Sequence, residues 1–157
     1  MRAVIQRVTR AEVRLGEPVG DEPAGTVVGK IGTGLAVLVG VTHDDGPENI
    51  ERMARKIAQL KLLRNESGDD DPAARVGVEE IGAPVLLISQ FTLYADVKKG
   101  RKPSWSHAAP GDVALPVFQA LAAELRAKGI HVETGSFGNY MEVELVNDGP
   151  FTIVAEA

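Results

Sequence analysis

A seven-residue run without a charged or polar side chain constrains the fold of this chain more than any other segment. Residues 35–41 read Leu-Ala-Val-Leu-Val-Gly-Val. A strand with one solvent-exposed face alternates apolar and polar residues, whereas this run is apolar throughout. We therefore expect residues 35–41 to form a strand that is buried on both faces. Residues 85–89 predict a second strand with an apolar core.

Shorter patterns predict the remaining strands. Residues 2–9 alternate apolar Val4 and Val8 with polar Gln6 and Thr9, which is typical of a half-buried strand. Further strands are expected at 12–15, at 27–31 and, as a short strand, from Val132. A closing pair of strands, 141–146 and 151–155, is expected around the bend Asn147-Asp148-Gly149-Pro150, because these residue types favour turns.

Two segments have helical periodicity. The first helix is expected to begin near Pro47, capped by Asp44 or Asp45, and the second to run from about Asp112 to Lys128, with Gly129 as its stop. Loops are expected at 16–25, 65–76 and 97–106. The whole pattern predicts an α+β fold in a single domain of residues 1–157. We expect a curved, mainly antiparallel, barrel-like sheet and two main helices.

Composition narrows the class of protein. The chain has 157 residues, which suits one domain with a substantial core, and its formal net charge of -5 argues against broad, nonspecific binding of nucleic acid. It has no cysteine and therefore neither a disulfide nor a thiolate site. Its apolar N-terminal stretch is too short for a signal peptide or a membrane span, so we expect a cytoplasmic protein that does not enter a membrane.

Two short motifs stand where backbone geometry could make a site. Ser89-Gln90-Phe91-Thr92-Leu93 follows an apolar strand, and Asn147-Asp148-Gly149-Pro150-Phe151-Thr152 lies near the C-terminus. Backbone N–H groups at a strand end can stabilise the oxyanion of an ester's tetrahedral intermediate. Each motif taken alone favours a structural role, as a strand end with satisfied hydroxyls or as a tight turn.

Together the two motifs resemble those of the D-aminoacyl-tRNA deacylases, the D-tyrosyl-tRNA deacylase family. The resemblance covers nearly the whole chain, from Met1 to Ile153. Other matching segments follow in the family's order: Gln6-Arg7-Val8, Pro103-Ser104-Trp105-Ser106, Thr134-Gly135-Ser136-Phe137-Gly138 and Met141. Three features depart from the family pattern: a longer loop at 16–25, an acidic segment at 68–75, and Trp105 where phenylalanine is commoner.

The resemblance implies an enzyme that removes D-amino acids, and glycine, from the 3′-terminal adenosine of tRNA and rejects L-aminoacyl-tRNA, as a proofreading step in translation. The implied catalytic residues are Ser89, Gln90, Phe91 and Thr92. In the family their backbone meets the ester, and the tRNA's own ribose 2′-hydroxyl assists in place of a protein nucleophile. The implied substrate-binding residues are Gly149, Pro150, Met141, Arg7 and Phe137.

The resemblance also implies a homodimer. In the family the Gly-Pro peptide is cis and is offered across the dimer interface into the partner's pocket, where its carbonyls exclude an L side chain. The arginine that matches Arg7 holds this element. The expected partners are therefore aminoacyl-tRNA and a second copy of the chain, with neither a cofactor nor a metal.

A basic stretch could contact the body of tRNA. Lys98, Lys99, Arg101 and Lys102 lie within five residues, and Trp105 follows them. The cations could bind phosphates and Trp105 could stack on a base, although a solvated basic loop explains the same pattern. The acidic run 69–71 and the scattered histidines His43, His107 and His131 favour solvated or structural roles over metal binding.

Two other functions are compatible with the sequence. A nonenzymatic RNA-binding module would use the basic loop as its main surface and would hold tRNA without releasing an amino acid. An esterase for small substrates would use Thr92 as a nucleophile, and this requires a base that lies close in space, because none is adjacent in the sequence.

Overall fold

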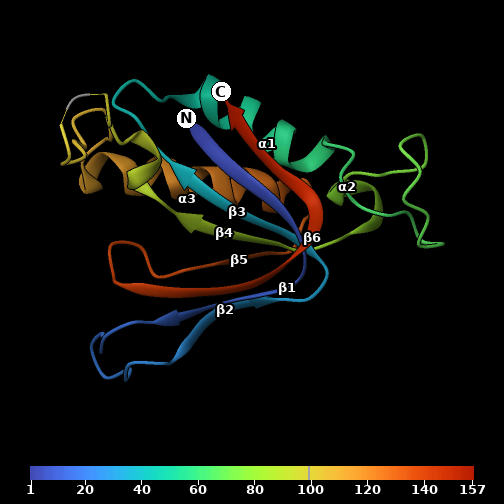
Figure 1. Cartoon of the computed structure of the whole chain (residues 1–157), viewed down its shortest axis with the longest axis horizontal. Helices are drawn as coiled ribbons and strands as arrows, with labels where there is room; N and C mark the ends of the chain where they lie inside the picture. Colours follow the sequence, from blue (N-terminus) through green and yellow to red (C-terminus); the bar gives the residue numbers. More distant parts are fainter. Residues whose placement is uncertain (99) are drawn as a thin grey trace.

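The computed structural model describes residues 1–98 and 100–157. Figure 1 labels the helices and strands. The strands are β1 (Arg2–Leu15), β2 (Val27–Ile31), β3 (Gly34–Gly40), β4 (Val85–Ser89), β5 (Val132–Thr134) and β6 (Met141–Glu156). The helices are α1 (Pro47–Gln59), α2 (Val78–Ile81), the 3-10 helix η1 (Phe91–Tyr94) and α3 (Gly111–Ala127).

The long strand β1 organises the sheet. It pairs antiparallel with β6 along one edge, from Arg2 opposite Glu156 to Leu15 opposite Met141. On the other edge β3 pairs with residues 2–8 and β2 with residues 11–14. β2 and β3 therefore follow one another in the same direction, joined by a bend at 32–33. The two strands expected at 2–9 and 12–15 are one, because pairing with β6 continues across residues 10 and 11.

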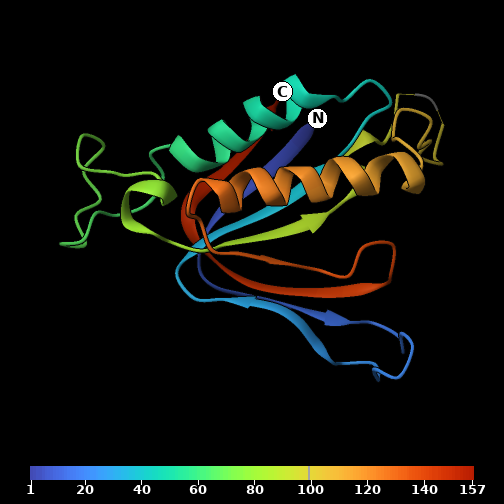
Figure 2. The ribbon, with the colours of Figure 1, turned by 180° about the vertical axis from the view of Figure 1, so that it is seen from behind.

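β3 and β4 occupy the middle of the fold. β4 pairs parallel with β3 and with β5, and the helices α1 and α3 cover one face of these strands (Figure 2). Val37 and Val39 of β3 pack against that helical layer, in which Met53 and Leu121 are fully buried. Burying a side chain of this size contributes roughly 1.5–3 kcal/mol. The opposite face of β3, at Ala36, lies under the curled half of the sheet, so the expectation that this strand is buried on both faces is confirmed.

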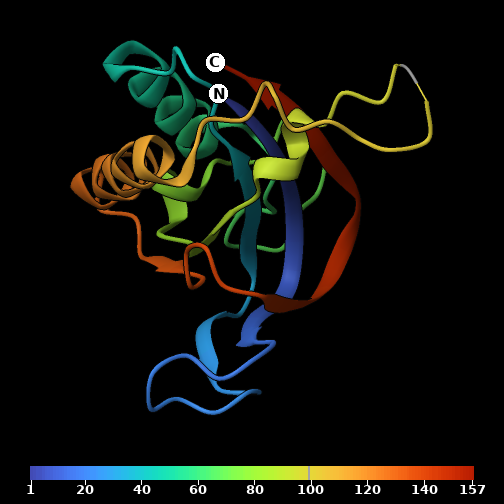
Figure 3. The same cartoon turned by 90° about the vertical axis from the view of Figure 1, so that its left-hand side faces the viewer.

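The expected α+β fold is confirmed, with α1 and α3 as its two main helices. Among the described residues the five strand pairings comprise three antiparallel and two parallel ones. The far half of β1, together with β2 and the start of β6, curls below the helical layer (Figure 3). The curl brings β2 against β5, where a Cβ at Gly29 would lie 2.4 Å from the carbonyl oxygen of Thr134. The sheet is therefore mixed and nearly closed.

β6 corrects one prediction. Segments 141–146 and 151–155 were expected to pair with each other around residues 147–150, but both pair with β1 as parts of one strand. Val8 is opposite Asn147, whereas Gln6 is opposite Thr152, so residues 148–151 all lie opposite Arg7. These residues form a wide bulge, in which the peptide between Gly149 and Pro150 is cis. The expected chain reversal is absent here because β1 offers an edge to both halves of β6.

The helix ends differ in detail from the expectation. α1 begins at Pro47 as expected, but Gly46 stands at its N-cap, and the Asn49 side chain accepts the Gly46 N–H at 3.0 Å. Asp45 instead pairs with the N-terminal amino group and accepts the N–H of Thr42. Gly129, at a φ of +80°, follows the end of α3 as expected. In the part of the chain that the structure describes, no helix has the length and apolar character needed to cross a membrane.

The close approach of β3 to Pro84 makes a testable prediction. A Cβ at Gly34 would lie 2.2 Å from the carbonyl oxygen of Pro84, and this oxygen is fixed because it accepts the N–H of Leu35 at 3.1 Å. We expect Gly34→Ala to lower the free energy of unfolding by about 1–3 kcal/mol. For a chain of this size each kcal/mol lowers the thermal midpoint by roughly 2–4 °C. Gly32→Ala is the matched control, since a Cβ there meets open space. Equal midpoints for the two variants would contradict the prediction.

Candidate active site

The end of β4 lies between two hollows. Ser89 is the last residue of β4, and Gln90 and Phe91 continue from it into η1. One hollow, of about 380 Å³, opens toward α3, and the other, of about 390 Å³, opens toward the start of β6. Ser89, Gln90 and Phe91 line both. The structure therefore brings three of the four predicted catalytic residues to one wall that separates two cavities.

The hollow next to α3 has apolar walls and an aromatic rim. Its walls come from β3, from the segment before α3, from α3 itself and from Phe137. Phe118 and Phe137 pack with their ring centroids 5.9 Å apart. At the rim Phe91 and Trp105 meet edge to face at 5.6 Å, and 54% and 41% of their surfaces are exposed. Such a hollow suits a flat, largely apolar group better than a charge.

The second hollow lies under the start of β6. Met141 and Val143 line it opposite Ile88. The Met141 sulfur lies 3.2 Å from the N–H of Ser136, which fixes it beside the turn at residues 136–139. Gly138 in this turn has a φ of +80°, a conformation that favours glycine, and it lines both hollows. The predicted substrate-binding residues Phe137 and Met141 thus belong to different hollows that share one wall.

Thr92 is the exception among the predicted catalytic residues. It lines neither hollow, and its hydroxyl accepts a hydrogen bond from the Gln90 side chain. Among residues 1–98 and 100–157 the hydroxyl has no other side-chain hydrogen bond. A hydroxyl nucleophile needs a base within hydrogen-bond reach, and Gln90 cannot act as one. The arrangement therefore favours a structural role for Thr92 in fixing Gln90.

The loop that carries the basic segment extends away from the body of the molecule (Figure 3). Lys98, Arg101 and Lys102 are exposed, and Lys99 lies outside the described residues. Trp105 connects this segment to the rim of the hollow. Lys98 itself lines a separate cavity with Arg2, Tyr94 and Asp96.

Arg7 is buried at the β6 bulge, beside Gly149 and Pro150. These three complete the predicted substrate-binding residues. The Arg7 side chain is 1% exposed, and an unpaired charge would be costly there. All five guanidinium N–H groups have acceptors. They are the carbonyl oxygens of Asp148 (3.1 Å), Leu62 (3.0 Å) and Gly149 (3.4 Å), and both carboxylate oxygens of Asp70 (2.8 and 3.0 Å). The guanidinium also stacks on the Phe151 ring at 4.5 Å.

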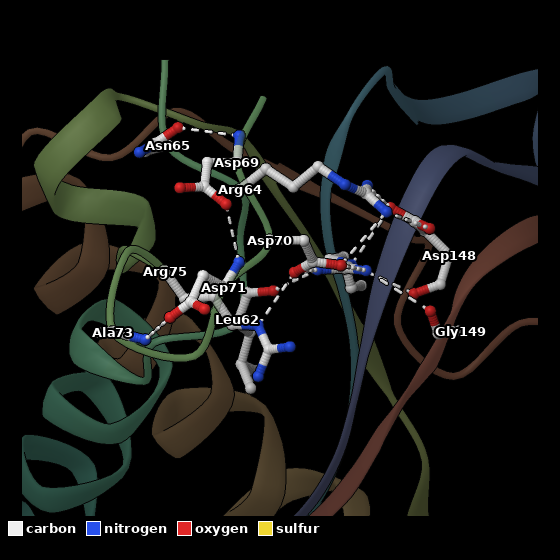
Figure 4. A network of polar contacts seen from close by, with 11 residues as sticks. Leu62, Arg64, Asn65, Asp69, Asp70, Asp71, Ala73, Arg75, Asp148 and Gly149 are labelled. Carbon is white, nitrogen blue, oxygen red and sulfur yellow. Dashed lines mark hydrogen bonds and ion pairs between the residues drawn. The ribbon is translucent and has the colours of Figure 1, made fainter. Parts of the chain in front are cut away.

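An ion-pair network extends from Arg7 to the acidic loop (Figure 4). Arg7 also pairs with the Asp148 carboxylate at 3.1 Å. Arg75 donates to Asp70 at 2.9 Å, and Arg64 contacts both Asp70 and Asp148. Hydrogen bonds from Arg7, and then from Arg75, hold the pKa of the Asp70 carboxyl well below its usual range. Arg64 likewise lowers the pKa of Asp148. The expectation that the whole acidic run is a solvated loop is wrong at Asp70, because the buried charge of Arg7 requires a carboxylate.

The two groups of predicted site residues lie far apart within one chain. Ser89 is in register with Val39 and so with Ala3, four residues along β1 from Arg7. Four residues of strand span about 13 Å, and the three strand spacings from β4 to β6 add about 14 Å across the sheet. The bulge that contains Gly149 and Pro150 is therefore remote from the hollows of its own chain.

Several site residues were not identified from the sequence. They are hollow-lining residues from β3, α3 and the turn before β6, and members of the ion-pair network: Val39, Val41, Ala109, Ala114, Phe118, Gly138, Val143, Arg64, Asp70, Arg75 and Asp148. An arginine in a strand that faces the core was the available signal for the network, because it requires acidic partners. His43, His107 and His131 are exposed, as expected. Within the described ranges no cluster of three acidic or histidine side chains could hold a metal ion.

The network predicts a pH-dependent stability. Because the folded-state pKa of Asp70 is depressed, its contribution is fully present above the unfolded-state pKa, about 3.9, and is lost as the pH falls below it. We expect Asp70→Asn to lower the thermal midpoint at neutral pH. The difference from the unmodified protein should shrink progressively once the pH falls below about 4. Thermal unfolding followed by circular dichroism between pH 7 and pH 3 measures this difference.

Asp71→Asn is the matched control for this prediction. The Asp71 carboxylate accepts the N–H of Ala73 at 2.9 Å within its own loop and does not contact Arg7. We expect the midpoint of this variant to follow the unmodified protein at every pH. A midpoint difference for Asp70→Asn that stays constant down to pH 3 would contradict an ionic contribution of Asp70.

Comparisons with known proteins cover the whole chain. The family model for D-Tyr-tRNA(Tyr) deacylase matches residues 4–156. A D-aminoacyl-tRNA deacylase of Kineococcus radiotolerans is 56% identical over 158 aligned residues, which cover 100% of both proteins. Proteins of the same name from Streptomyces griseus subsp. griseus and Mycobacterium tuberculosis are 49% and 48% identical, each with 99% of both proteins covered.

Two solved structures share the fold. A protein described as c-Myc DNA Unwinding Element Binding Protein superimposes with a TM-score of 0.85 and 36% identity, over 100% of this chain and 99% of that one. A probable eukaryotic D-amino acid tRNA deacylase superimposes with a TM-score of 0.81 and 18% identity, over 99% and 98%. At 18% identity the second likeness concerns the fold alone.

Proposed function

The chain belongs to the D-Tyr-tRNA(Tyr) deacylase family, and from this premise we propose which of its residues carry the reaction. The resemblance inferred from the sequence is thereby confirmed. The enzyme hydrolyses the ester that joins a D-amino acid to tRNA, a proofreading step in translation. We assign the reaction to Ser89, Gln90 and Phe91. One observation carries this assignment: these residues line both hollows.

The shared wall suits an ester that joins two different groups. The substrate is an amino acid linked to an adenosine, and each of these groups needs its own space. If each occupies one hollow, the ester bond between them crosses Ser89–Phe91. Phe137 then contacts the group in the first hollow and Met141 the group in the second. We propose that glycine esters are also substrates, because glycine fits wherever a D side chain fits.

The chemistry of this site depends on the backbone. Water adds to the ester carbonyl, and the oxyanion that forms needs a hydrogen-bond donor, for which the N–H group of Phe91 is the candidate. The Gln90 N–H is already used, since it donates to the Val39 carbonyl at 2.7 Å. The C–O bond then breaks, and the ribose 3′-oxygen leaves with a proton. We propose that the neighbouring 2′-hydroxyl of the ribose assists this proton transfer in place of a protein base.

We propose that selectivity for D-substrates comes from a second copy of the chain. The carbonyls of Gly149 and Pro150 would enter the second hollow of the partner and exclude an L side chain. Both residues are exposed, and the long separation along the sheet keeps them from the hollows of their own chain. A closed two-fold dimer would complete both sites at once. In this proposal Arg7 contributes by holding the bulge.

We propose that the tRNA approaches over the basic segment. Lys98, Lys99, Arg101 and Lys102 would bind phosphates, and Trp105 would stack on an unpaired base near the 3′ end. The exposure of Trp105 at the rim of the first hollow supports this direction of approach. The overall net charge of -5 restricts such binding to a local surface.

We further propose that residues 1–157 act as one deacylase domain in the cytoplasm. The match of the family model over residues 4–156 supports a single functional unit. A cytoplasmic location suits an enzyme that acts on the tRNA pool used in translation.

Turnover of matched D- and L-aminoacyl-tRNA tests the function. We expect release of the D-amino acid and of glycine, and little release of the L-amino acid. A tRNA that lacks the 2′-hydroxyl of its terminal ribose should react roughly 10²–10⁴ times more slowly, the range in which a positioned proton-transfer group contributes. Single-turnover deacylation measures each rate.

The two competing functions give different results in the same assay. A binding module would hold both tRNAs and release neither amino acid. An esterase that uses Thr92 as nucleophile would lose nearly all activity as Thr92→Ala and would be indifferent to the 2′-hydroxyl. We expect Thr92→Ala to keep most of its activity, because Thr92 lines neither hollow.

Mixed dimers test whether the bulge acts in trans. Gly149→Ala should fold normally, since its Cβ would meet only the Asn147 side chain, at 3.6 Å, and it should lose D-deacylation by crowding the partner's hollow. A Gln90→Ala, Phe91→Ala double variant should lose activity because it damages both hollows. We expect differently tagged, co-expressed copies of the two variants to recover up to half of the unmodified activity. In such a pair one intact hollow receives one intact bulge.

Two results would contradict action in trans. One is the absence of recovery in purified mixed dimers. The other is a monomer in sedimentation experiments that retains full D-deacylation. Efficient L-deacylation by Gly149→Ala would instead show that the missing side chain of glycine, rather than the backbone, sets the selectivity.

A further inference from the structure

The bulge in β6 lacks its own backbone support. Residues 148–151 stand opposite the single residue Arg7, so the regular ladder between β1 and β6 is interrupted there. Side chains hold the bulge instead. Arg7 donates to the carbonyl oxygens of Asp148 and Gly149, and Arg64 pairs with the Asp148 carboxylate. The position of the Gly149 carbonyl therefore depends on how the Arg7 guanidinium is oriented.

Asp70 fixes that orientation. Its two carboxylate oxygens accept from Nη1 and Nη2 of Arg7 at 2.8 and 3.0 Å, a bidentate pair that defines the plane of the guanidinium. With this plane fixed, the remaining Nη2 hydrogen points to the Gly149 carbonyl, and the Nε hydrogen points to Asp148, whose carbonyl oxygen and carboxylate Oδ2 each lie 3.1 Å from Nε. The arginine side chain is otherwise long and flexible. The Leu62 carbonyl accepts a hydrogen bond from Nη1 alone, and a single bond of this kind does not fix the plane of the guanidinium.

The acidic loop holds Asp70 in turn. Arg75 donates to Asp70 Oδ1 at 2.9 Å, and its guanidinium lies 4.6 Å from the centre of the Phe151 ring, on which Arg7 also stacks. Asp69 and Asp71 do not take part, because their carboxylates accept backbone N–H groups within the loop. Figure 4 shows Asp70 directed toward the bulge, between Arg75 and the residues of β6.

We propose that Asp70 is a positioning residue for substrate selection, acting through Arg7 on the Gly149 carbonyl. The inference rests on the proposed role of Gly149 and Pro150 in excluding L-substrates. A carbonyl oxygen has two lone pairs, so the bond from Arg7 leaves one free to face a substrate. The acidic segment at 68–75, which departs from the family pattern, thus supplies the residue that holds Arg7, and through it the Gly149-Pro150 bulge, in place.

The ratio of D- to L-deacylation rates tests this proposal. A displacement of about 1 Å can cost a hundredfold in rate, so a loosened bulge should both slow D-hydrolysis and admit L-substrates. We expect Asp70→Asn to lower the ratio by at least about tenfold. Asp70→Glu, which retains two charged oxygens, should recover part of it. Asp69→Asn and Asp71→Asn are the matched controls and should keep the unmodified ratio.

The ratio separates positioning from stability. A residue that only stabilises the fold would lower both rates together, in proportion to the folded fraction, and would leave the ratio unchanged. Arg75→Gln is a second variant in case Asp70→Asn does not fold, because it loosens the Asp70 carboxylate and leaves the pair with Arg7 in place. We expect a smaller fall in the ratio for Arg75→Gln.

Each failure has its own signature. An unmodified D-to-L ratio in the folded Asp70→Asn variant, or in Arg75→Gln when Asp70→Asn does not fold, would overturn the role of Asp70. Absence of D-deacylation in the unmodified protein would overturn the proposed function itself. Partial recovery of the D-to-L ratio by Asp70→Glu, together with an unmodified ratio in Asp69→Asn and Asp71→Asn, would support the positioning role of Asp70.

Discussion

Backbone pairing along β1 is the constraint on which the other elements depend. This strand has 14 residues and is paired on both edges, with β6 on one side and β3 followed by β2 on the other. The position of every strand along this ladder is therefore set relative to β1. β4 extends the ladder from β3 and ends at Ser89, on the level of Ala3, while the β6 bulge lies at the level of Arg7. The pairing register therefore places the Ser89 end of β4 and the β6 bulge about one β4 length apart along the strand direction.

A buried charge connects three distant segments. Arg7 sits in the middle of β1 with 1% of its side chain exposed, where a guanidinium is tolerated only if its donors are satisfied. Its acceptors come from the segment after α1, from the acidic loop and from β6. The same interactions that neutralise the charge immobilise the bulge. The neutralisation of Arg7, which the fold requires, and the proposed role of the bulge in substrate selection therefore depend on the same contacts.

The proposed site uses backbone groups where many hydrolases use acidic or basic side chains. This choice fits a substrate that carries a hydroxyl next to its scissile ester, because the protein then has to provide mainly position and oxyanion stabilisation. It also fits the proposed selection by main-chain carbonyls, which every residue possesses and which a fixed bulge can present in one geometry. In the proposed dimer each active site would be complete only when the hollows of one chain meet the β6 bulge of the other.

The sequence by itself determined the fold class, most of the strand and helix segments, and the family. The apolar run at 35–41 required burial on both faces, and the motifs at 89–92 and 147–152 identified the family because local order along the chain is visible in the sequence. It did not reveal that 141–146 and 151–155 share β1 as their partner, nor that Asp70 of the acidic run neutralises Arg7, 63 residues away. Strand partners and ion pairs between distant residues are decided by three-dimensional packing. Only the tertiary structure therefore placed two hollows on either side of Ser89 and kept Gly149 remote from them.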